Sequence, residues 1–440
     1  MIIRGAKTIR GRMLVPGDKS ISHRAAMCAA LADGTSSIRN FSTSSDCADT
    51  LSCLEALGVA IERDDNALLI KGVGIDGLHE PQAPLDCGNS GTTMRLLAGI
   101  LAGQDFKSTL TGDESLRSRP MQRIIEPLRM MGAMISADEG RAPLVIQGHK
   151  SLNPISYELL LASAQVKSCI LLAGLNAEGR TKVTENQITR DHTERMLRSF
   201  GVQIETGKAE REGATASFVA ISGPARLTAG QVSVPGDISS AAYFIAAAAL
   251  LSGSSLEIRE VGMNPTRSLF LNQFRGLGLN VEITDAHETN NEPVGSIRIQ
   301  ARPSQQSGKA DSSMTIRGLI VPQLIDELPL LAVVGSQVSG GIEIRDAAEL
   351  RVKESDRIAN TALNLRAMGA SVKEFDDGLR VAGPTRLRGA KIDPSGDHRI
   401  AMAFTVAGLI AEGQTEITNS DCVAVSFPEF FELLESVVER

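Results

Sequence analysis

A short apolar helix that ends at a glycine and leads into an alternating strand recurs six times along the 440-residue chain. The six copies read ALADGTSSIRNF, GILAGQDFKSTLTGD, GLNAEGRTKVTE, ALLSGSSLEIREV, VVGSQVSGGIEIRDA and LIAEGQTEITNSD. In each copy the glycine follows the residue that opens the helix by 14 to 16 positions, as Gly34 follows Asp18 and Gly103 follows Asn89. Such regular spacing indicates an internally repeated fold.

A second amphipathic segment follows the strand in these copies, with Leu and Met at helical spacing and Gly where the helix ends. Examples are CLEALGVAIE, LRMMGAMIS, MLRSFGVQIE, FRGLGLNVEI and LRAMGASVKE. Short strands ending in glycine, such as ALLIKG, LVIQG, FVAISG and LRVAG, then lead into the next copy. Each copy therefore predicts a β-α-β-α-β-β unit, and the chain predicts an α/β fold with buried helices behind sheets.

The sixth copy stops at its second helix, SFPEFFELLESVV, without the strand that would complete it. MIIRG followed by GRMLVPGD reads like FVAISG followed by VSVPGD, so we expect residues 1–14 to complete the last unit. One domain then spans 15–234, and the other is discontinuous, 235–440 plus 1–14. Two chain crossings, near Pro16 and Pro235, join them and permit closure on a ligand. We interpret the polar segments HETNNEPVGS and ARPSQQSGKADSS as solvated loops that lengthen the fourth unit.

The tetrapeptide Val-Pro-Gly-Asp occurs at 15–18 and again at 234–237. The first copy continues with Lys19, Ser20 and Arg24, whereas the second has Ile and Tyr in place of the two cations. We therefore interpret the first copy as an anion-binding helix start and the second as scaffold.

Composition narrows the functional class. A net charge of −7, a pI near 5.6, no Trp and 3% aromatic residues argue against a nucleic-acid partner. No apolar stretch of signal length opens the chain, and its longest apolar run, 243–251, is too short to cross a membrane. Six cysteines without a C-x-x-C pair favour small buried thiols in a cytoplasmic protein over disulfides or a zinc site.

Cationic and hydroxyl side chains gather where the repeated helices begin. Helix starts offer unpaired backbone N–H groups and partial positive charge, which attract anions. The motifs PGDKSISHR, DCGNSGTTMR, LRSRP, SAQVKS, TRDHTER, ELRVKESDR and GDHRIAM supply Lys19, Ser20, Arg24, Asn89, Gly91, Thr92, Arg95, Arg119, Ser163, Gln165, Lys167, Arg190, Lys353, Glu354, Arg357 and Arg399. Any one arginine taken alone also fits a surface charge or a salt bridge. Together, in an acidic protein, they favour ligands that carry phosphate and carboxylate groups.

Carboxylates among these cations are candidates for proton transfer. Asp326 and Glu327 begin the fifth predicted helix, and Glu354 stands beside Lys353. For Asp326 alone, an N-cap is the alternative interpretation. No phosphate-binding P-loop, zinc-protease, nucleophile-elbow or dinucleotide motif occurs. The motif histidines fit no metal spacing and are expected to have structural or hydrogen-bonding roles: His23, His192 and His398.

The motifs PGDKSISHR, GNSGTTMR, LRSRP, SAQVKS, LRVKESDR and DHRIAMAF together resemble the EPSP synthase family, the 3-phosphoshikimate 1-carboxyvinyltransferases, over essentially the whole chain. The resemblance implies a two-lobed inside-out α/β barrel of six βαβαββ repeats, three per domain, with the active site in the cleft between lobes. It implies transfer of the enolpyruvyl group of phosphoenolpyruvate to the 5-hydroxyl of shikimate 3-phosphate, a step toward chorismate and the aromatic amino acids. A cytoplasmic monomer without metal or organic cofactor, and a target of glyphosate, is implied as well.

The resemblance also implies roles for residues at matching motif positions. Shikimate 3-phosphate would be held by Ser20, Arg24, Ser163, Ala164, Gln165 and Arg190. Phosphoenolpyruvate would be held by Lys19, Gly91, Arg119, Arg357 and Arg399. Asn89, Thr92 and Lys353 complete the expected substrate-binding set. Asp326 would deprotonate the 5-hydroxyl, Glu354 would protonate the methylene carbon and later remove a proton, and Lys19 completes the catalytic set.

This sequence departs from the family pattern in places. Many members carry a Lys where Val425 stands, so one phosphate contact is absent or replaced, and some have Asn in place of Glu349. Two alternatives remain open. The sister enzyme that acts on UDP-N-acetylglucosamine has Lys-Asn at its first motif and a reactive Cys where Glu114 stands. A non-catalytic protein that binds phosphometabolites would lack acids such as Asp326 and Glu354.

Overall fold

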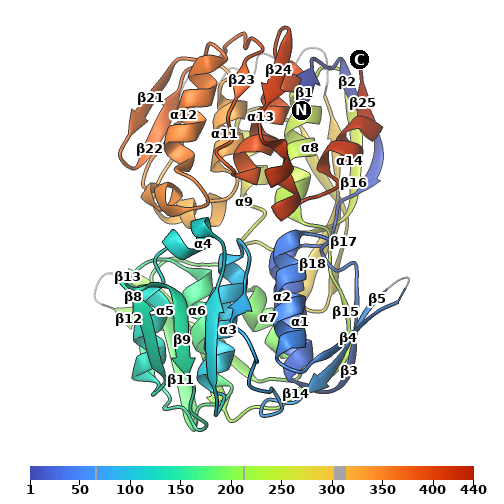
Figure 1. Cartoon of the computed structure of the whole chain (residues 1–440). Coiled ribbons are helices and arrows are strands. Elements are labelled where there is room, and N and C mark those ends of the chain that lie inside the picture. The colour runs from blue at the N-terminus through green and yellow to red at the C-terminus, as the bar shows by residue number, and fades with distance from the viewer. Residues whose placement is uncertain (65–66, 212–213, 302–313) are drawn as a thin grey trace. The chain divides into compact units, whose positions relative to one another are not determined.

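Each repeat contributes one small sheet, and six sheets are present in the part of the chain that the computed structural model describes, residues 1–64, 67–211, 214–301 and 314–440 (Figure 1). The predicted α/β fold is thus confirmed. The chain falls into two compact units, here called lobe A and lobe B. Lobe A consists of Gly17–Val234 with Thr289–Glu292, and lobe B of Met1–Pro16, Pro235–Glu288 and Pro293–Arg440. Beyond Ala301, the segment predicted as a second polar loop lies outside the described residues.

Lobe A contains three of the sheets, each with strands of mixed direction. The strand orders are β14 (Leu227–Thr228), β3 (Ala32–Arg39), β5 (Ala67–Val73), β4 (Ala60–Asp64), with β15 (Gln231–Ser233) also on β3; β6 (Leu85–Asp86), β7 (Lys107–Thr111), β9 (Arg141–Gln147), β8 (Met134–Asp138); and β10 (Ser156–Glu158), β11 (Gly179–Glu185), β13 (Ala214–Gly223), β12 (Ile204–Arg211). The first strand of each order is parallel to its neighbour, and β15 is parallel to β3, whereas the remaining pairs are antiparallel. Parallel neighbours require a crossover, which a helix supplies between β6 and β7 and between β10 and β11.

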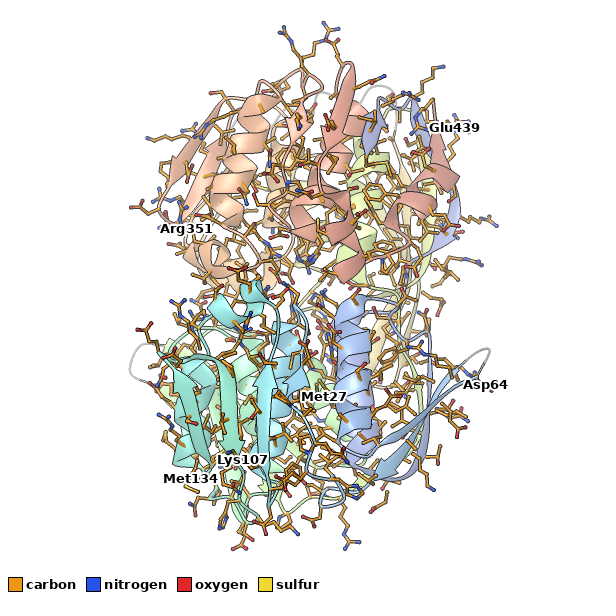
Figure 2. The ribbon with its side chains drawn as sticks, viewed as in Figure 1. Met27, Asp64, Lys107, Met134, Arg351 and Glu439 are labelled. Atoms are coloured by element: carbon orange, nitrogen blue, oxygen red, sulfur yellow. The ribbon has the colours of Figure 1, made fainter. Side chains whose placement is uncertain are left out.

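Three inner helices of lobe A are largely buried: α1 (Lys19–Leu31), α3 (Gly91–Ala102) and α6 (Ala164–Gly174). Every residue of α1 from Ile21 to Leu31 is buried, among them Met27 (Figure 2). A helix without a polar stripe is stable only when it is enclosed on all sides. The outer helices are α2 (Ser45–Ala56), α4 (Glu114–Ser118), α5 (Gln122–Met130) and α7 (His192–Ser199).

Lobe B contains the other three sheets. Their strand orders are β17 (Val281–Thr289), β18 (Glu292–Gln300), β16 (Ser255–Gly262), β2 (Thr8–Leu14), β25 (Val438–Glu439); β19 (Met314–Ile316), β20 (Ile342–Ile344), β22 (Gly378–Val381), β21 (Val372–Phe375); and β1 (Ile2–Arg4), β24 (Gln414–Ile417), β23 (Lys391–Ile392). The N-terminal residues therefore serve two sheets: β1 completes that of the sixth repeat, and β2 pairs with β16 of the fourth.

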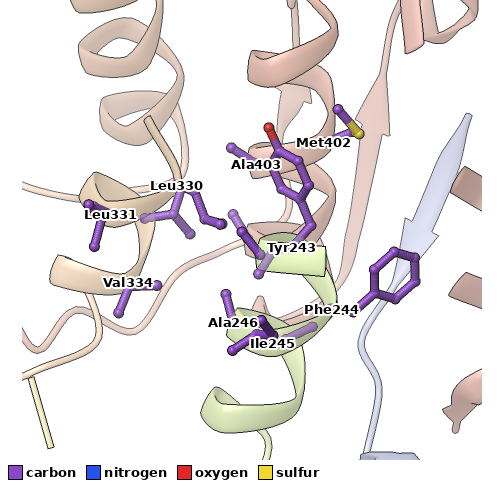
Figure 3. Packing of buried hydrophobic residues seen from close by; sticks show 14 of the residues in the cluster. Tyr243, Phe244, Ile245, Ala246, Leu330, Leu331, Val334, Met402 and Ala403 are labelled. Atoms are coloured by element: carbon purple, nitrogen blue, oxygen red, sulfur yellow. The ribbon is translucent and has the colours of Figure 1, made fainter. Parts of the chain in front are cut away.

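The inner helices of lobe B are α8 (Ile238–Leu250), α11 (Leu328–Gly335) and α13 (His398–Ile410). Figure 3 shows where they meet, with Tyr243 and Ala246 of α8, Leu330 and Val334 of α11, and Ala403 of α13. The other helical segments are α9 (Leu269–Gly276), α10 (Val321–Leu324), α12 (Arg357–Ala367) and α14 (Phe430–Val437), with the 3-10 turns η2 (Gly318–Ile320), η3 (Ala348–Val352) and η4 (Ser420–Val425).

Five of the six inner helices begin with a side chain that accepts a backbone N–H of the first turn: Asp18, Ser90, Ser163, Asp237 and Asp397. Such caps satisfy N–H groups that have no partner within the helix. The exception is α11, whose N-cap residue is Glu327 and whose side chain makes no capping hydrogen bond. The N-cap interpretation of Asp326 is therefore wrong, because the N-cap position is occupied by Glu327 and the helix begins at Leu328.

The sequence predicted that HETNNEPVGS is a solvated loop, and this prediction is wrong. The segment forms the end of β17, a turn and the start of β18, so it is part of a hairpin. Its tip, Thr289–Glu292, belongs to lobe A, so the chain passes between the lobes at four places and not at two. Glu292 is buried, and one of its carboxylate oxygens lies 2.6 Å from His192 Nδ1. The polar composition of the tip reflects hydrogen bonds to distant residues, which local patterning does not reveal.

Five of the six cysteines are buried and Cys422 is half-buried, and all six are free thiols, as the sequence predicted. Within the described ranges, no single helix has the length and apolar composition that a membrane crossing needs. The segment of η2 and α10 reaches that length and composition only together with α11, from which it is separated by a bend of 105°.

Candidate active site

The start of α1 places two predicted cations in lobe A. Lys19 Nζ lies 2.7 Å from Asp46 Oδ2 on α2. Arg24 is buried and donates to Thr193 Oγ1 (2.6 Å), to the carbonyl of Ser20 (2.8 Å) and to Ser168 Oγ (2.9 Å). Burial lowers the pKa of Arg24 to about 10, although the charges of Glu194 and Asp18 oppose the shift, and the charge of Arg190 contributes in the same direction as burial. Arg24 is thus a guanidinium fixed by neutral oxygens, and Arg190 is close enough to act on it electrostatically.

The start of α3 brings together a second group in lobe A. Arg95 donates to Gln165 Oε1 at 2.7 Å, and Gln165 Nε2 donates to Thr92 Oγ1 at 3.0 Å. Asn89 accepts from Arg119 Nη2 at 2.6 Å. Arg119 is the residue after α4 and not at a helix start, which corrects the sequence-based placement. These contacts join the predicted residues of three motifs through neutral amide and hydroxyl groups.

The third group of lobe A surrounds the start of α6. Ser163 is its N-cap and Ala164 its first residue, and both are half-buried. Lys167, one turn further on, is fully buried between Glu185 (3.2 Å) and Glu194 (2.8 Å). Although burial opposes its charge, these two carboxylates raise the pKa of Lys167. Lys167 therefore fits a structural ion pair better than a ligand contact.

The arginines of lobe B have acidic partners. Buried Arg357, the first residue of α12, donates to Asp397 Oδ2 through Nε at 2.7 Å and to Glu354 Oε2 through Nη2 at 2.6 Å. Arg399, at the start of α13, lies 3.2 Å from Asp326 Oδ2, and the other oxygen of Asp326 lies 3.6 Å from Arg357. The structure thus connects four predicted residues, Asp326, Glu354, Arg357 and Arg399, in one ion-pair network.

Burial alone would lower the pKa of both arginines, but their carboxylate partners raise it above the usual value. For Arg357 these are Asp397 and Glu354, and for Arg399 the first is Asp326. The same contacts fix the orientation of the carboxylates beside these arginines.

Lys353 and Glu354 lie between η3 and α12, so neither begins a helix. Burial lowers the pKa of Lys353, although Glu349, 3.3 Å away, opposes the shift. Glu349 occupies the position where some relatives have Asn, and here it serves as the partner of this lysine. Val425 ends η4, and the segment Ser420–Val425 contains no lysine.

Sequence reasoning missed the acidic partners that orient the predicted cations. Asp46 pairs with Lys19, and Asp397 takes two hydrogen bonds from Arg357 while it also caps α13. The internal repeat could have revealed Asp397, because Asp397 occupies the same repeat position as Asp18 and Asp237. Asp46 has no such signal.

The chain matches a family profile described as EPSP synthase (3-phosphoshikimate 1-carboxyvinyltransferase) over residues 3–434. It is 47% identical over 440 residues to the 3-phosphoshikimate 1-carboxyvinyltransferase of Geobacter sp. (strain M21), covering 100% of this chain and 99% of the relative. The corresponding protein of Koribacter versatilis (strain Ellin345) is 49% identical over 439 residues, with the same coverage. A solved structure of EPSP synthase from Acinetobacter baumannii matches with a TM-score of 0.84 at 40% identity, covering 99% of this chain and 97% of that chain.

Likeness of this extent, on a fold of repeated α/β units, defines the class as carboxyvinyltransferases. Within that class, the chain belongs to the EPSP synthase family.

Proposed function

We propose that this protein transfers the enolpyruvyl group of phosphoenolpyruvate to the 5-hydroxyl of shikimate 3-phosphate, giving 5-enolpyruvylshikimate 3-phosphate and phosphate. Its membership of the family supports this reaction. The observation that carries the proposal is the network of lobe B, in which Asp326 and Glu354 both contact Arg357. A protein that only bound phosphometabolites would need the cations but not these two carboxylates.

Shikimate 3-phosphate is proposed to bind to lobe A. Its phosphate and ring hydroxyls suit the hydroxyl, amide and guanidinium groups at the starts of α1 and α6. This proposal is supported by the neutral partners of Arg24, which leave its charge available to an anion. The residues proposed to hold it are Ser20, Arg24, Ser163, Ala164, Gln165 and Arg190.

Phosphoenolpyruvate is proposed to contact residues of both lobes. Lys19 and Arg119 would hold its phosphate, close to the backbone of Gly91, with Asn89 and Thr92 beside them. Arg357 and Arg399 would hold its carboxylate, with Lys353 nearby. A trianionic substrate is bound well by guanidinium and ammonium groups in partly desolvated surroundings.

The proposed chemistry assigns Asp326 as the base that takes the proton from the 5-hydroxyl. The oxygen of that hydroxyl then bonds to the central carbon of phosphoenolpyruvate. Glu354 donates a proton to the methylene carbon, which gives a tetrahedral intermediate. Glu354 then removes a proton from that carbon as the bond to phosphate breaks, and Lys19 stabilises the departing phosphate. Charges fixed in advance around the intermediate would be the main source of rate enhancement.

We further propose that the protein is a cytoplasmic monomer that uses no cofactor and has no nucleic-acid or membrane partner. This proposal is based on its small-molecule substrates and its free thiols. Light scattering during size-exclusion chromatography would test the monomer.

The test of the reaction is release of phosphate from phosphoenolpyruvate, measured with and without shikimate 3-phosphate, with the organic product identified by mass spectrometry. We expect phosphate and 5-enolpyruvylshikimate 3-phosphate in equal amounts, and neither when one substrate is omitted. Parallel reactions with UDP-N-acetylglucosamine should give no phosphate. Calorimetric binding of shikimate 3-phosphate without turnover would instead identify a binding protein.

A further inference from the structure

The second Val-Pro-Gly-Asp copy is not an inert counterpart of the first. Ser239 follows the N-cap Asp237 by two residues, as Ser20 follows Asp18, and thus occupies the same position on the opening turn of its helix. Its hydroxyl donates to Glu327 Oε1, and both residues are nearly inaccessible to solvent, at 3% and 2% exposure. A helix start favours an anion, and the anion at the start of α8 is a carboxylate of the protein itself.

A buried arginine completes this arrangement. Arg267, 2% exposed and two residues before α9, donates to Ser239 Oγ at 2.7 Å and lies 3.4 Å from Asp237 Oδ1. A buried carboxylate is costly unless charges and hydrogen bonds compensate it. Ser239 compensates Glu327 through a direct hydrogen bond, and Arg267 contributes through its own hydrogen bond to Ser239. The position of Glu327 therefore depends on α8 and, through Ser239, on the segment before α9.

Glu327 is also the residue that follows Asp326. The two lie at the corner where the chain turns by 105° between α10 and α11. Of the six inner helices, only α11 lacks a side-chain cap of its own, so contacts of Glu327 with other elements must hold this corner. The same corner presents Asp326 to Arg399 at 3.2 Å and to Arg357 at 3.6 Å.

We propose that Glu327, held by Ser239 and Arg267, is a positioning residue that fixes the corner carrying Asp326 in the orientation needed for proton abstraction. The inference rests on the proposed function, because it assigns Asp326 as the base. A displacement of about 1 Å in a reacting group can cost about 100-fold in rate, so a corner held from outside its own helix is a sensitive point for catalysis.

The test compares Ser239→Ala and Glu327→Gln with the wild type. We expect kcat to fall by about 10- to 100-fold in both variants, with KM for each substrate changed by less than about threefold. Thr405→Ala is the matched control, because Thr405 is a fully buried hydroxyl of α13 that donates only to Ala401 O within its own helix. Its kcat should stay within about twofold of the wild type. Ser239→Ala should remain folded at the assay temperature, with a Tm below that of the control because buried Glu327 loses a hydrogen-bond donor.

The pH dependence of kcat separates positioning from a loss of folding. The charged and titratable groups around Glu327 are Asp237 and Tyr243 of α8, Arg267, Asp326, and Arg399 of α13. Replacing Glu327 with neutral Gln removes a negative charge beside Asp326, so the acid limb of kcat should move to lower pH. Ser239→Ala keeps every charge and should leave that limb in place.

Wild-type kcat in both Ser239→Ala and Glu327→Gln would overturn the inference while leaving the proposed function intact. So would losses in kcat no larger than those of Thr405→Ala. Absence of turnover in the wild type would instead refute the proposed function itself. Should Glu327→Gln fail to fold, Ser239→Ala, which removes one hydroxyl, still decides.

Discussion

In lobe A, Arg24, Arg95 and Arg119 donate to neutral oxygens, whereas in lobe B, Arg357 and Arg399 are paired with carboxylates. Arg24 contacts two hydroxyls and a carbonyl, and Arg119 contacts the amide of Asn89. Arg357 contacts three carboxylates, and Arg399 is paired with Asp326. The lysines of lobe A are exceptions, since Lys19 and Lys167 do have acidic partners.

This difference separates two uses of the same side chain. An arginine with neutral partners keeps its charge available to a ligand, and burial lowers the pKa of Arg24 to about 10. An arginine among carboxylates is already compensated, and these partners raise the pKa of Arg357 despite its burial. We therefore expect substitution of Arg24 in lobe A to weaken binding of shikimate 3-phosphate, and substitution of the carboxylates Asp326 and Glu354 in lobe B to slow the chemistry.

The largest expected effect follows from Glu354→Gln. The amide keeps the shape of the side chain and a hydrogen bond to Arg357, but it cannot transfer a proton. We expect kcat to fall by about 10²- to 10⁴-fold, while the Kd for shikimate 3-phosphate changes by less than about threefold. Steady-state kinetics and calorimetric titration measure the two quantities.

The control for Glu354→Gln is Glu374→Gln, which breaks the contact of Glu374 with Arg351, also in lobe B, at 3.2 Å. It should retain wild-type kcat. A variant at Glu354 that loses shikimate 3-phosphate binding in proportion to its activity would show that this residue positions the ligand and does not transfer protons.

The second effect, in lobe A, is expected from Arg24→Lys. A lysine has one donor group and cannot reproduce the three directed hydrogen bonds of Arg24 together with a contact to phosphate. The Kd for shikimate 3-phosphate should rise by about 10- to 100-fold, and kcat at saturation should fall by less than about tenfold. Arg198→Lys, at an exposed position whose side chain donates to Ile204 O in the same lobe, is the control. An unchanged Kd in Arg24→Lys would refute the assignment of Arg24 to binding of shikimate 3-phosphate.

The repeated fold could be predicted from the sequence because it depends on local features: apolar helices, glycine at the turns and alternating strands. The hairpin from β17 to β18 could not, because β17 is largely exposed and the contact that buried Glu292 makes with His192 spans 100 positions of sequence. Hydrogen bonds of His23 and His192, to Thr50 and Glu292, confirm the structural roles predicted for them.

The candidate site was predictable where motifs repeat and not where partners come from elsewhere in the chain. Repetition pointed to Lys19, Arg24 and Arg399 at helix starts. The second Val-Pro-Gly-Asp copy was interpreted as scaffold because it lacks cations, and repetition gave no sign of the buried arginine beside it. Arg267 supplies a cation there although it lies 28 residues beyond Ser239 in the sequence. Helical periodicity relates only residues a few positions apart, so it could not reveal this contact.

A smaller effect is expected from Gly91→Ala in lobe A. A Cβ at this position would lie 2.7 Å from Arg95 Nη1 and 3.5 Å from Arg119 Nη1. Both atoms end flexible side chains, so the fold should tolerate the methyl group while the space beside the proposed phosphate site shrinks. We expect the inhibition constant of glyphosate, which is slightly longer than phosphoenolpyruvate, to rise by about tenfold, and KM for phosphoenolpyruvate to rise less.

Gly230→Ala is the control for Gly91→Ala, because a Cβ at Gly230 would meet nothing within 4 Å. It should leave inhibition unchanged. Equal inhibition constants for wild type and Gly91→Ala would refute the steric argument.

The smallest effect concerns stability and reports the positive potential of lobe A. Burial, followed by the charges of Lys19 and Arg24, lowers the pKa of His23 well below its usual value. The folded protein therefore stays unprotonated at His23 when the unfolded chain begins to bind a proton near pH 6.5. Below that pH, wild type should lose up to about 1.4 kcal/mol of unfolding free energy per pH unit relative to His23→Gln, which cannot titrate. Denaturant unfolding of both proteins between pH 5 and 7.5 measures the difference, with His149→Gln, at an exposed position, expected to follow the wild type. A constant difference across this range would mean that burial at the start of α1, together with the charges of Lys19 and Arg24, does not keep His23 unprotonated in the folded protein.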